Sequence, residues 1–354
     1  MTTISELDTP CVLVDLDRVE QNLQRAQNFA DKAGLKLRPH IKTHKLPRFA
    51  QRAIDLGAVG ITVQKLGEAE VMADAGILDL LLTFNIIGAA KLKRLKALND
   101  RVTIRVVADS TECVAGLSQT FADAGKPLGV LVECDTGMGR CGVQSPQAAL
   151  DLARTIIAAP GLEFFGLMTY PAAGKYQVAA AWLAEAKALF DAAGLAVPVI
   201  TTGGTPDIWH ADEAGVATEY RPGTYIYMDR SQVAAGAASY DDCALTVLAT
   251  VVSHPTTGRA IIDAGSKALT SDLLGLVGHG YIPAYPEAKI VGLSEEHGTL
   301  DVSACADGGP RIGEQIAIIP NHCCPVTNLF DFVHLMRNGQ LVETVPVAAR
   351  GRVD

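Results

Sequence analysis

The 354-residue sequence lacks several features that would assign it to a protein class at once. It contains no run of 18 apolar residues, so we expect no membrane-spanning helix. Its 30 Lys and Arg are outnumbered by 39 Asp and Glu, and a net charge of −9 argues against binding to nucleic acid. Residues 1–10 carry acidic side chains without a basic cluster, which argues against a secretory signal.

Cysteine is also scarce, with eight residues and no spacing typical of a disulfide framework. We therefore expect a protein of the reducing cytoplasm. Apolar residues, in contrast, are abundant: 49% of the chain is hydrophobic and only 19% is charged. Such a chain is not disordered, and its length suits one large or two moderate domains with a substantial core.

Short apolar runs alternate with amphipathic stretches over the first two thirds of the chain. The runs predict eight strands, at Lys36–Lys42, Val59–Gln64, Leu78–Asn85, Val102–Ala108, Leu128–Cys134, Glu163–Tyr170, Val197–Thr201 and Ala217–Arg221. Between most of them the periodicity is helical. Strands that are apolar nearly throughout and alternate with helices are typical of a parallel sheet buried on both faces. Eight such units favour a closed (β/α)₈ barrel, with an open doubly wound sheet as the alternative.

After about residue 235 helical periodicity nearly disappears. Short apolar segments are broken there by Gly, Pro and Asp, at Leu245–Val252, Arg259–Asp263, Lys289–Ser294, Thr299–Ser303 and Gln315–Ile319. This pattern is typical of an all-β domain. We therefore predict an α/β protein, with a (β/α)₈ TIM-type barrel over residues 12–235 and a mainly-β domain over residues 236–354. Residues 1–11 are a further candidate element of the second domain.

The C-terminal ends of the predicted strands collect polar residues, and a barrel of this kind places its chemistry there. Strand ends that exit into water are often polar in any case. Segment Arg38–Lys45 stands out, because it packs five ionisable groups into eight residues. A lysine at the end of a buried strand, such as Lys42, loses its proton more easily and can attack an aldehyde. A solvated loop lysine is the alternative.

Two glycine-containing turns follow the last two predicted strands, at Thr201–Pro206 and Arg221–Thr224. Consecutive glycines before a helix allow backbone N–H groups to approach a phosphate closely. Barrels often bind phosphate after strands seven and eight. The two turns therefore predict a phosphate site, although most glycine pairs are simple turns.

Segment Pro320–Pro325 contains three adjacent His and Cys residues. In an extended segment, residues i and i+2 face the same side, so His322 and Cys324 can converge on one ion while Cys323 points away. Imidazole and thiolate suit zinc or a similar metal. A buried thiol cluster is the alternative.

Four segments together resemble the alanine-racemase-like pyridoxal phosphate (PLP) enzymes. They are Arg38–Lys45, Asp135–Arg140, Gly166–Tyr170 and Arg221–Gly223. Within that group the chain looks like the D-serine dehydratases and D-threonine aldolases. The resemblance extends into the last third of the chain, at Asp263–Ala268, Ser294–Gly298 and Pro320–Pro325. It implies a barrel with a β-domain, paired as a homodimer in which each active site takes residues from the partner subunit.

The resemblance also implies roles for individual residues. Lys42 would bind PLP covalently, Tyr170 would lie against the cofactor, and Arg140 would reach toward the cofactor side of the pocket. These three are the expected catalytic residues. Arg221 would stand at the pyridine nitrogen. The remaining cofactor-binding residues expected, mainly around the phosphate, are Thr202, Gly203, Gly204, Thr205, Gly223 and Thr224.

The dehydratase-like members of this group place His-x-Cys where the D-threonine aldolases typically place His-x-Asp. The resemblance therefore implies a divalent metal at His322 and Cys324, zinc first, with manganese or cobalt as alternatives. It also favours β-elimination over retro-aldol cleavage.

The expected activity is a PLP- and metal-dependent lyase that converts D-serine or another D-3-hydroxy amino acid into a 2-oxo acid and ammonia. The first alternative is retro-aldol cleavage to glycine and an aldehyde. The second is amino-acid racemisation, because Arg221 stands where racemases keep an arginine and the lyases more often have His or Gln. A guanidinium donates hydrogen bonds and accepts none.

Overall fold

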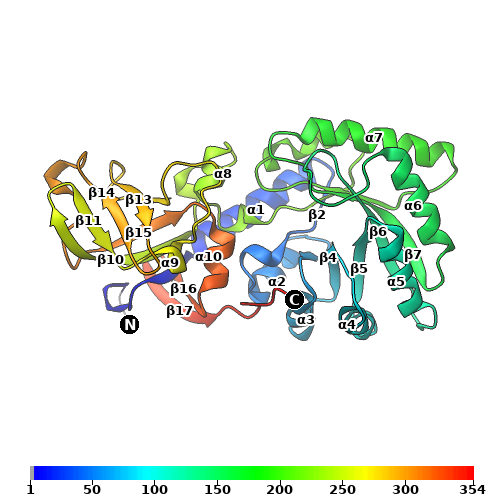
Figure 1. The fold of residues 1–354 in the computed structure, drawn as a ribbon, viewed down its shortest axis with the longest axis horizontal. Helices are drawn as coiled ribbons and strands as arrows, with labels where there is room; N and C mark the ends of the chain where they lie inside the picture. The colour runs from blue at the N-terminus through cyan, green and yellow to red at the C-terminus, as the bar shows by residue number, and fades with distance from the viewer. Residues whose placement is uncertain (1–3) are drawn as a thin grey trace. The chain divides into compact units, whose positions relative to one another are not determined.

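The computed structural model describes residues 4–354 (Figure 1). Its contacts divide the chain into two compact units. The barrel unit comprises residues 25–42, 46–223 and 352–354, and the β unit comprises residues 4–24, 43–45 and 224–351. Helix α1 (Leu16–Lys32) contains residues of both. The predicted boundary between residues 235 and 236 stays a prediction.

The barrel unit is built on eight parallel strands, which follow the order β2-β9-β8-β7-β6-β5-β4-β3. They are β2 (Lys36–Leu37), β3 (Ile61–Val63), β4 (Asp79–Asn85), β5 (Thr103–Ala108), β6 (Leu128–Cys134), β7 (Leu162–Thr169), β8 (Val199–Thr202) and β9 (Glu219–Tyr220). A parallel bridge between His40 and Thr62 joins the two edges of the sheet. The sheet is thus a curled, TIM-like one, which confirms the predicted fold class over the open doubly wound sheet.

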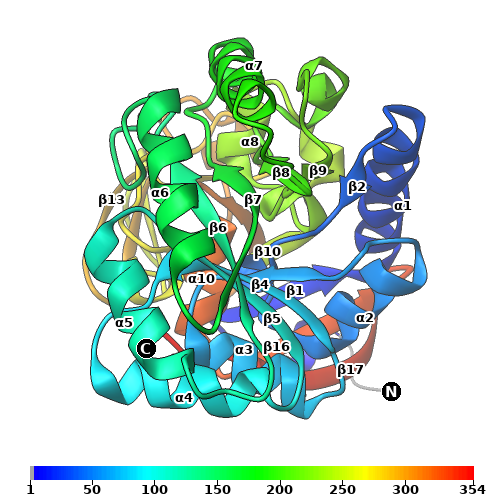
Figure 2. The same cartoon turned by 90° about the vertical axis from the view of Figure 1, so that its right-hand side faces the viewer.

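Helices cover the outer face of this sheet (Figure 2). They are α2 (Pro47–Asp55), α3 (Leu66–Asp74), α4 (Ala89–Asn99), α5 (Thr111–Phe121), α6 (Pro146–Ala158) and α7 (Tyr176–Ala192). Helices α5 and α6 are preceded by the N-cap residues Ser110 and Ser145, whose hydroxyls accept a backbone N–H three residues on. Such a cap satisfies a donor that the helix itself leaves free.

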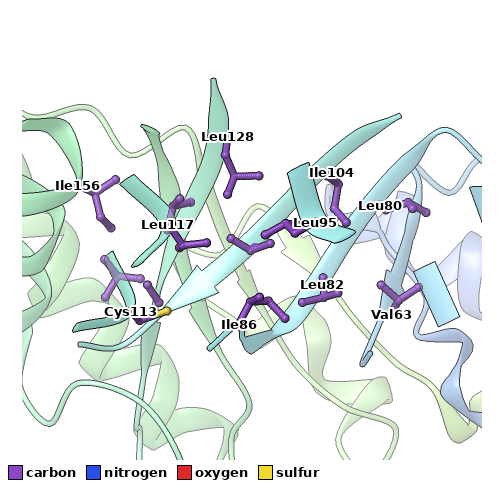
Figure 3. Close-up of a cluster of buried hydrophobic side chains, with 14 of the residues drawn as sticks. Val63, Leu80, Leu82, Ile86, Leu95, Ile104, Cys113, Leu117, Leu128 and Ile156 are labelled. Atoms are coloured by element: carbon purple, nitrogen blue, oxygen red, sulfur yellow. The ribbon is translucent and has the colours of Figure 1, made fainter. Parts of the chain in front are cut away.

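The barrel unit has one core outside the sheet and a smaller one inside it. Because strand side chains alternate between the two faces, Leu128 and Val130 of β6 join the outer core while Leu131 joins the inner one. Figure 3 shows side chains of the outer core, contributed by strands and by helices α4 to α6. Each buried aliphatic side chain contributes roughly 1.5–3 kcal/mol of transfer free energy.

A partly buried ion network joins Arg38, which follows β2, to residues of β4, β5 and β9. Arg38 donates from Nε to Glu219 at 2.8 Å and from Nη1 to Asp79 at 2.6 Å, and Arg105 also contacts Asp79 at 3.0 Å. Burial alone would lower the pKa of Arg38, but the charges of both carboxylates outweigh it and raise that pKa. The network anchors the strand from which the chain continues to Lys42.

The β unit is mainly β, as predicted, with a sheet in the order β13-β14-β11-β10-β1-β16-β17 and with β15 paired to β10 and β12. Its strands are β1 (Cys11–Asp15), β10 (Leu245–Thr256), β11 (Arg259–Ile262), β12 (Gly280–Tyr281), β13 (Lys289–Leu293), β14 (Gly298–Asp301), β15 (Gln315–Pro320), β16 (Phe332–Arg337) and β17 (Gln340–Pro346). Its helices are α8 (Arg230–Ala234), α9 (Ser266–Leu269) and α10 (Cys323–Leu329). No helix in residues 4–354 is long and apolar enough to cross a membrane.

Gly166 in β7 is a position where only glycine fits. Its φ is +148°, and a Cβ built there would overlap the carbonyl oxygen of Val199 in the neighbouring strand. We expect Gly166→Ala to lower the free energy of unfolding by about 3 kcal/mol or more, measured by chemical denaturation. Gly174→Ala is the matched control, because Gly174 has φ +72° but nothing within 4 Å of its Cβ position, so strain alone should cost about 1–2 kcal/mol. Equal losses in the two variants would contradict the packing argument.

Candidate active site

Lys42 lies in a short 3₁₀ turn (Ile41–Thr43) and not at the end of a long strand. The predicted strand Lys36–Lys42 is too long, because regular pairing of β2 ends at Leu37. Lys42 is half-buried, with Nζ 5.9 Å from the ring centroid of Tyr170. Lys45 is 5% exposed and donates from Nζ to the carbonyl of Ala349 at 3.3 Å. Of the two lysines, Lys42 is therefore the one directed at a candidate catalytic side chain.

A chain of hydrogen bonds supports the Lys42 backbone. The N–H of Lys42 donates to His40 Nδ1 at 3.3 Å, so His40 carries its proton on Nε2. That nitrogen donates to Gln64 Oε1 at 3.0 Å, and Gln64 Nε2 donates to the carbonyl of Thr83 at 2.9 Å. The arrangement fixes the orientation of the His40 ring, and it explains His40 and Gln64 as supports of the turn that carries Lys42.

Tyr170 follows β7 directly and brings the predicted catalytic residues together. The Arg140 guanidinium carbon lies 5.2 Å from the Tyr170 ring centroid, which also places a cation over its ring. The exposed loop that carries Arg140 is shaped by Asp135, whose Oδ1 accepts the N–H groups of Gly137 and Gly139 at 2.9 and 3.1 Å. The pKa of Asp135 lies below its usual value. Partial burial acts to raise this pKa, but the hydrogen bonds from the loop outweigh burial.

The two predicted glycine turns are tied to each other. Thr205 Oγ1 accepts the N–H of Gly223 at 3.2 Å, and the Tyr220 hydroxyl donates to the carbonyl of Gly204 at 2.9 Å. Gly203 has φ +96°, and a Cβ there would overlap the Tyr220 ring. The residues of this cradle are all buried: Thr202, Gly203, Gly204, Thr205 and Gly223. A backbone that excludes side chains in this way fits a phosphate.

Arg221 is a buried cation held by neutral groups. It donates from Nε to Thr201 Oγ1 at 2.9 Å and from Nη2 to the carbonyl of Thr169. Burial lowers its pKa to about 10, although the negative charges of Glu219 and Glu133 act in the opposite direction. Both of its acceptors lie at the C-terminal ends of β7 and β8, so the guanidinium belongs to the candidate site.

Glu133 is a candidate site residue that the sequence analysis missed. It is the penultimate residue of β6, only 5% exposed, and pairs in register with Met168 of the inner core. Burial raises its pKa to about 7, and the nearby positive charges of Arg140 and Arg221 limit the rise. A lone carboxylate in an otherwise apolar strand was the available signal.

The predicted metal pair lies in the β unit, in a local structure that differs from expectation. The expected extended segment is wrong, because helix α10 starts at Cys323 and His322 is its N-cap. His322 and Cys324 are nevertheless close enough for Cys324 to raise the pKa of His322. Cys323 is fully buried, and its N–H donates to Asp229 Oδ2 at 3.0 Å. The backbone of Cys323 is therefore held by Asp229, next to the pair.

Two threonines and one aspartate surround this pair. Cys324 Sγ lies 3.1 Å from Thr43 Oγ1 and 3.6 Å from Thr224 Oγ1, so the Thr224 hydroxyl faces the thiol. His322 Nδ1 lies 2.8 Å from Asp272 Oδ2. Burial lowers the pKa of His322, but the hydrogen bond and charge of Cys324, together with Asp272, outweigh burial and raise it to about 9.

The donor set of the pair fits a borderline-soft metal such as zinc. Among residues 4–354 there is no group of three or more His, Cys, Asp or Glu side chains arranged to hold an ion. The described chain therefore offers a pair of ligands, which would leave the other positions on a metal for water or substrate. Thr43, which faces the Cys324 sulfur, is also the residue that follows Lys42 in the chain.

Comparison with known proteins identifies the family. Residues 14–231 match the family described as "Alanine racemase, N-terminal domain", and residues 244–336 match the "Putative serine dehydratase domain". The chain belongs to the family of the alanine racemase N-terminal domain.

Three similar proteins are lyases by name. The 3-hydroxy-D-aspartate aldolase of Paracoccus denitrificans (strain Pd 1222) is 33% identical over 98% of this chain and 93% of its own. The solved D-threonine aldolase of Filomicrobium marinum has a TM-score of 0.88 at 34% identity, covering 99% of this chain and 98% of its own. The D-threo-3-hydroxyaspartate dehydratase of Delftia sp. HT23 has a TM-score of 0.87 at 30% identity, covering 98% and 99%. A cysteine-to-alanine mutant of D-threo-3-hydroxyaspartate dehydratase has been solved in the metal-free form.

The raised pKa of Glu133 predicts a pH-dependent stability. Folding shifts this carboxyl from about 4.5 to about 7, so the folded chain binds the proton more tightly and stability falls as pH rises through that window. Glu133→Gln removes the charge, and its unfolding free energy relative to wild type should improve by up to about 3 kcal/mol between pH 4.5 and 8. Chemical denaturation at several pH values measures this. The exposed Glu163→Gln is the control and should show no such trend. A flat difference for Glu133→Gln would contradict the assignment.

Proposed function

We propose that this chain is a PLP- and divalent-metal-dependent lyase acting on D-β-hydroxy amino acids. Its main reaction is dehydration and deamination of D-serine or another D-3-hydroxy amino acid to a 2-oxo acid and ammonia. The observation that carries the proposal is the pair of His322 and Cys324 at the start of helix α10. The His322 ring lies 2.8 Å from Asp272, and the Cys324 sulfur lies 3.1 Å from the Thr43 hydroxyl. A thiolate and an imidazole are ligands that favour zinc, with manganese or cobalt as alternatives. Bound there, the ion would supply Lewis acidity to a departing hydroxyl.

The barrel unit supplies the residues for PLP. Lys42 offers the amine for covalent attachment, and its 5.9 Å approach to the Tyr170 ring supports a shared role. The buried turns at Gly203 and Gly223 offer backbone and hydroxyl groups for the phosphate. When bound, PLP supplies an electron sink for the bond broken at the substrate Cα. Arg221 can donate a hydrogen bond to an acceptor there but cannot take up a proton.

A second candidate function is retro-aldol cleavage to glycine and an aldehyde. Two of the similar proteins described above are named aldolases, which favours it. Two observations favour dehydration. The candidate metal ligand is Cys324, and the similar D-threo-3-hydroxyaspartate dehydratase was solved in the metal-free form as a cysteine-to-alanine mutant. Incubation with D-serine, D-threonine and D-3-hydroxyaspartate, with separate assays of 2-oxo acid, glycine and inverted amino acid, distinguishes dehydratase, aldolase and racemase. Inverted amino acid as the main product would overturn the lyase assignment.

We also propose that the enzyme works as a homodimer in the cytoplasm. Three exposed aliphatic side chains lie close together in the chain, at Leu273, Leu274 and Val277, and burial against a second copy would remove them from water. All eight cysteines are free thiols, which suits a reducing compartment. Sedimentation at assay concentration measures the subunit state.

The cofactor lysine is tested by two neighbouring substitutions. Lys42→Ala should abolish the visible absorbance of the protein reconstituted with PLP, because the amine for covalent attachment is gone. Lys45→Ala should keep that absorbance, because Lys45 is directed at Ala349. Loss of the band in Lys45→Ala alone would show that the wrong lysine has been assigned.

Removal of the metal should separate turnover from cofactor binding. A chelator should abolish lyase turnover and leave the PLP absorbance intact, because Lys42 and the residues of the glycine turns are not the proposed metal ligands. Cys324→Asp should weaken zinc binding and favour manganese, since carboxylate replaces thiolate. Cys323→Ala should retain the metal, because the Cys323 side chain is fully buried and the variant keeps its backbone hydrogen bond to Asp229. Full turnover in chelated enzyme would refute the metal-dependent mechanism.

A further inference from the structure

We propose that Asp272 is a positioning residue for the metal pair, holding His322 with Nε2 as the nitrogen available to an ion. This inference rests on the proposed function and deepens it. Asp272 Oδ2 lies 2.8 Å from His322 Nδ1, although the two residues are 50 positions apart in the chain. An imidazole has two ring nitrogens, and with Nδ1 against a carboxylate the nitrogen left for a metal ion is Nε2.

The backbone at Asp272 is fixed independently of this contact. Its carbonyl accepts Asn321 Nδ2 at 3.2 Å, and the same amide nitrogen donates to the carbonyl of Gly278 at 2.8 Å. Asn321 is 1% exposed, and its Oδ1 accepts a hydrogen bond from Arg230 at 3.0 Å. Asn321 also directly precedes His322, so one buried amide ties the segment of Asp272 to the residue next to the ligand.

A hydrogen bond also fixes the main chain just before Asp272. The N–H of Asp272 donates to Thr270 Oγ1 at 3.1 Å, and Thr270 has a φ of +61°, which is uncommon for a residue with a branched Cβ. The main chain of Asp272 is therefore held at its N–H and at its carbonyl. The carboxylate meets His322 from a backbone that is already in place, which reduces the conformational entropy lost in the contact.

A carboxylate on the far nitrogen of a metal-binding imidazole has two effects. It fixes the ring orientation and tautomer, and it increases the basicity of the coordinating nitrogen. Loss of such a partner typically weakens metal affinity by about 10–100-fold. Cys324 receives comparable support from the hydroxyl of Thr43, so each member of the pair has its own hydrogen-bond partner.

The test is zinc affinity, measured with Zn²⁺ alone by competition against a chromophoric chelator on metal-stripped, PLP-loaded protein. Asp272→Asn keeps the shape but loses the charge and should weaken zinc binding by about 10-fold, and Asp272→Ala by up to about 100-fold. The metal-free melting temperature and the PLP absorbance should stay at their wild-type values, which a general structural defect would not allow. Asp331→Asn is the control, because Asp331 is an exposed carboxylate of the β unit paired with Arg350, and its zinc affinity should match wild type.

Tight zinc binding by wild type with unchanged affinity in both Asp272 variants would overturn this inference and leave the proposed function standing. Failure of wild type to bind zinc would overturn the metal assignment and this inference together. A lower metal-free melting temperature, with affinity loss in proportion, would assign Asp272 to folding and also overturn the inference.

Discussion

The candidate site depends on the closure of the parallel sheet, in which one edge of the sheet pairs with the other. After β2 ends at Leu37 the chain still pairs with the other edge, through the 2.7 Å hydrogen bond from the Thr62 N–H to the Pro39 carbonyl and the bridge of Thr62 with His40. A curled sheet gathers the C-terminal ends of its strands around one opening, so residues far apart in sequence become neighbours. Lys42 and Tyr170 meet there, although 128 positions separate them.

Two ionisable side chains in this opening, Glu133 and Arg221, have shifted pKa values. Two cations, Arg140 and Arg221, approach a buried carboxyl at Glu133, whose pKa rises because burial outweighs their attraction. Arg221 has neutral hydrogen-bond partners, and burial lowers its pKa. Groups with shifted pKa values are frequent at catalytic sites, because an acid or base in catalysis needs a pKa different from the one it has in water. The same residues reduce stability at some pH values, which is an expected consequence of building a site in the core.

Much of the barrel was predictable because its strands are apolar nearly throughout. Strand β6 was predicted exactly and β4 within one residue, since burial on both faces leaves an uninterrupted apolar run. Strands β2 and β9 are much shorter than predicted, because the backbone bends there into the turns that carry Lys42 and Gly223. Strands β1, β16 and β17 escaped prediction: β17 is mostly exposed, and β1 pairs with strands more than 200 residues away. Local patterns carry little information about such distant pairing.

The sequence by itself determined the TIM-like sheet with its mainly-β domain, because the periodicity of apolar residues is a local property. It also predicted the lysine segment and the glycine turns from side-chain chemistry, and the metal pair from the resemblance to a known family. The tertiary structure decided which lysine faces Tyr170, that Glu133 is buried beside two arginines, and that Asp272 meets His322. It also replaced an extended segment by a helical turn at Cys323. Each of these depends on burial or on a contact between distant residues, and both arise only when the folded chain excludes water and brings separate segments together.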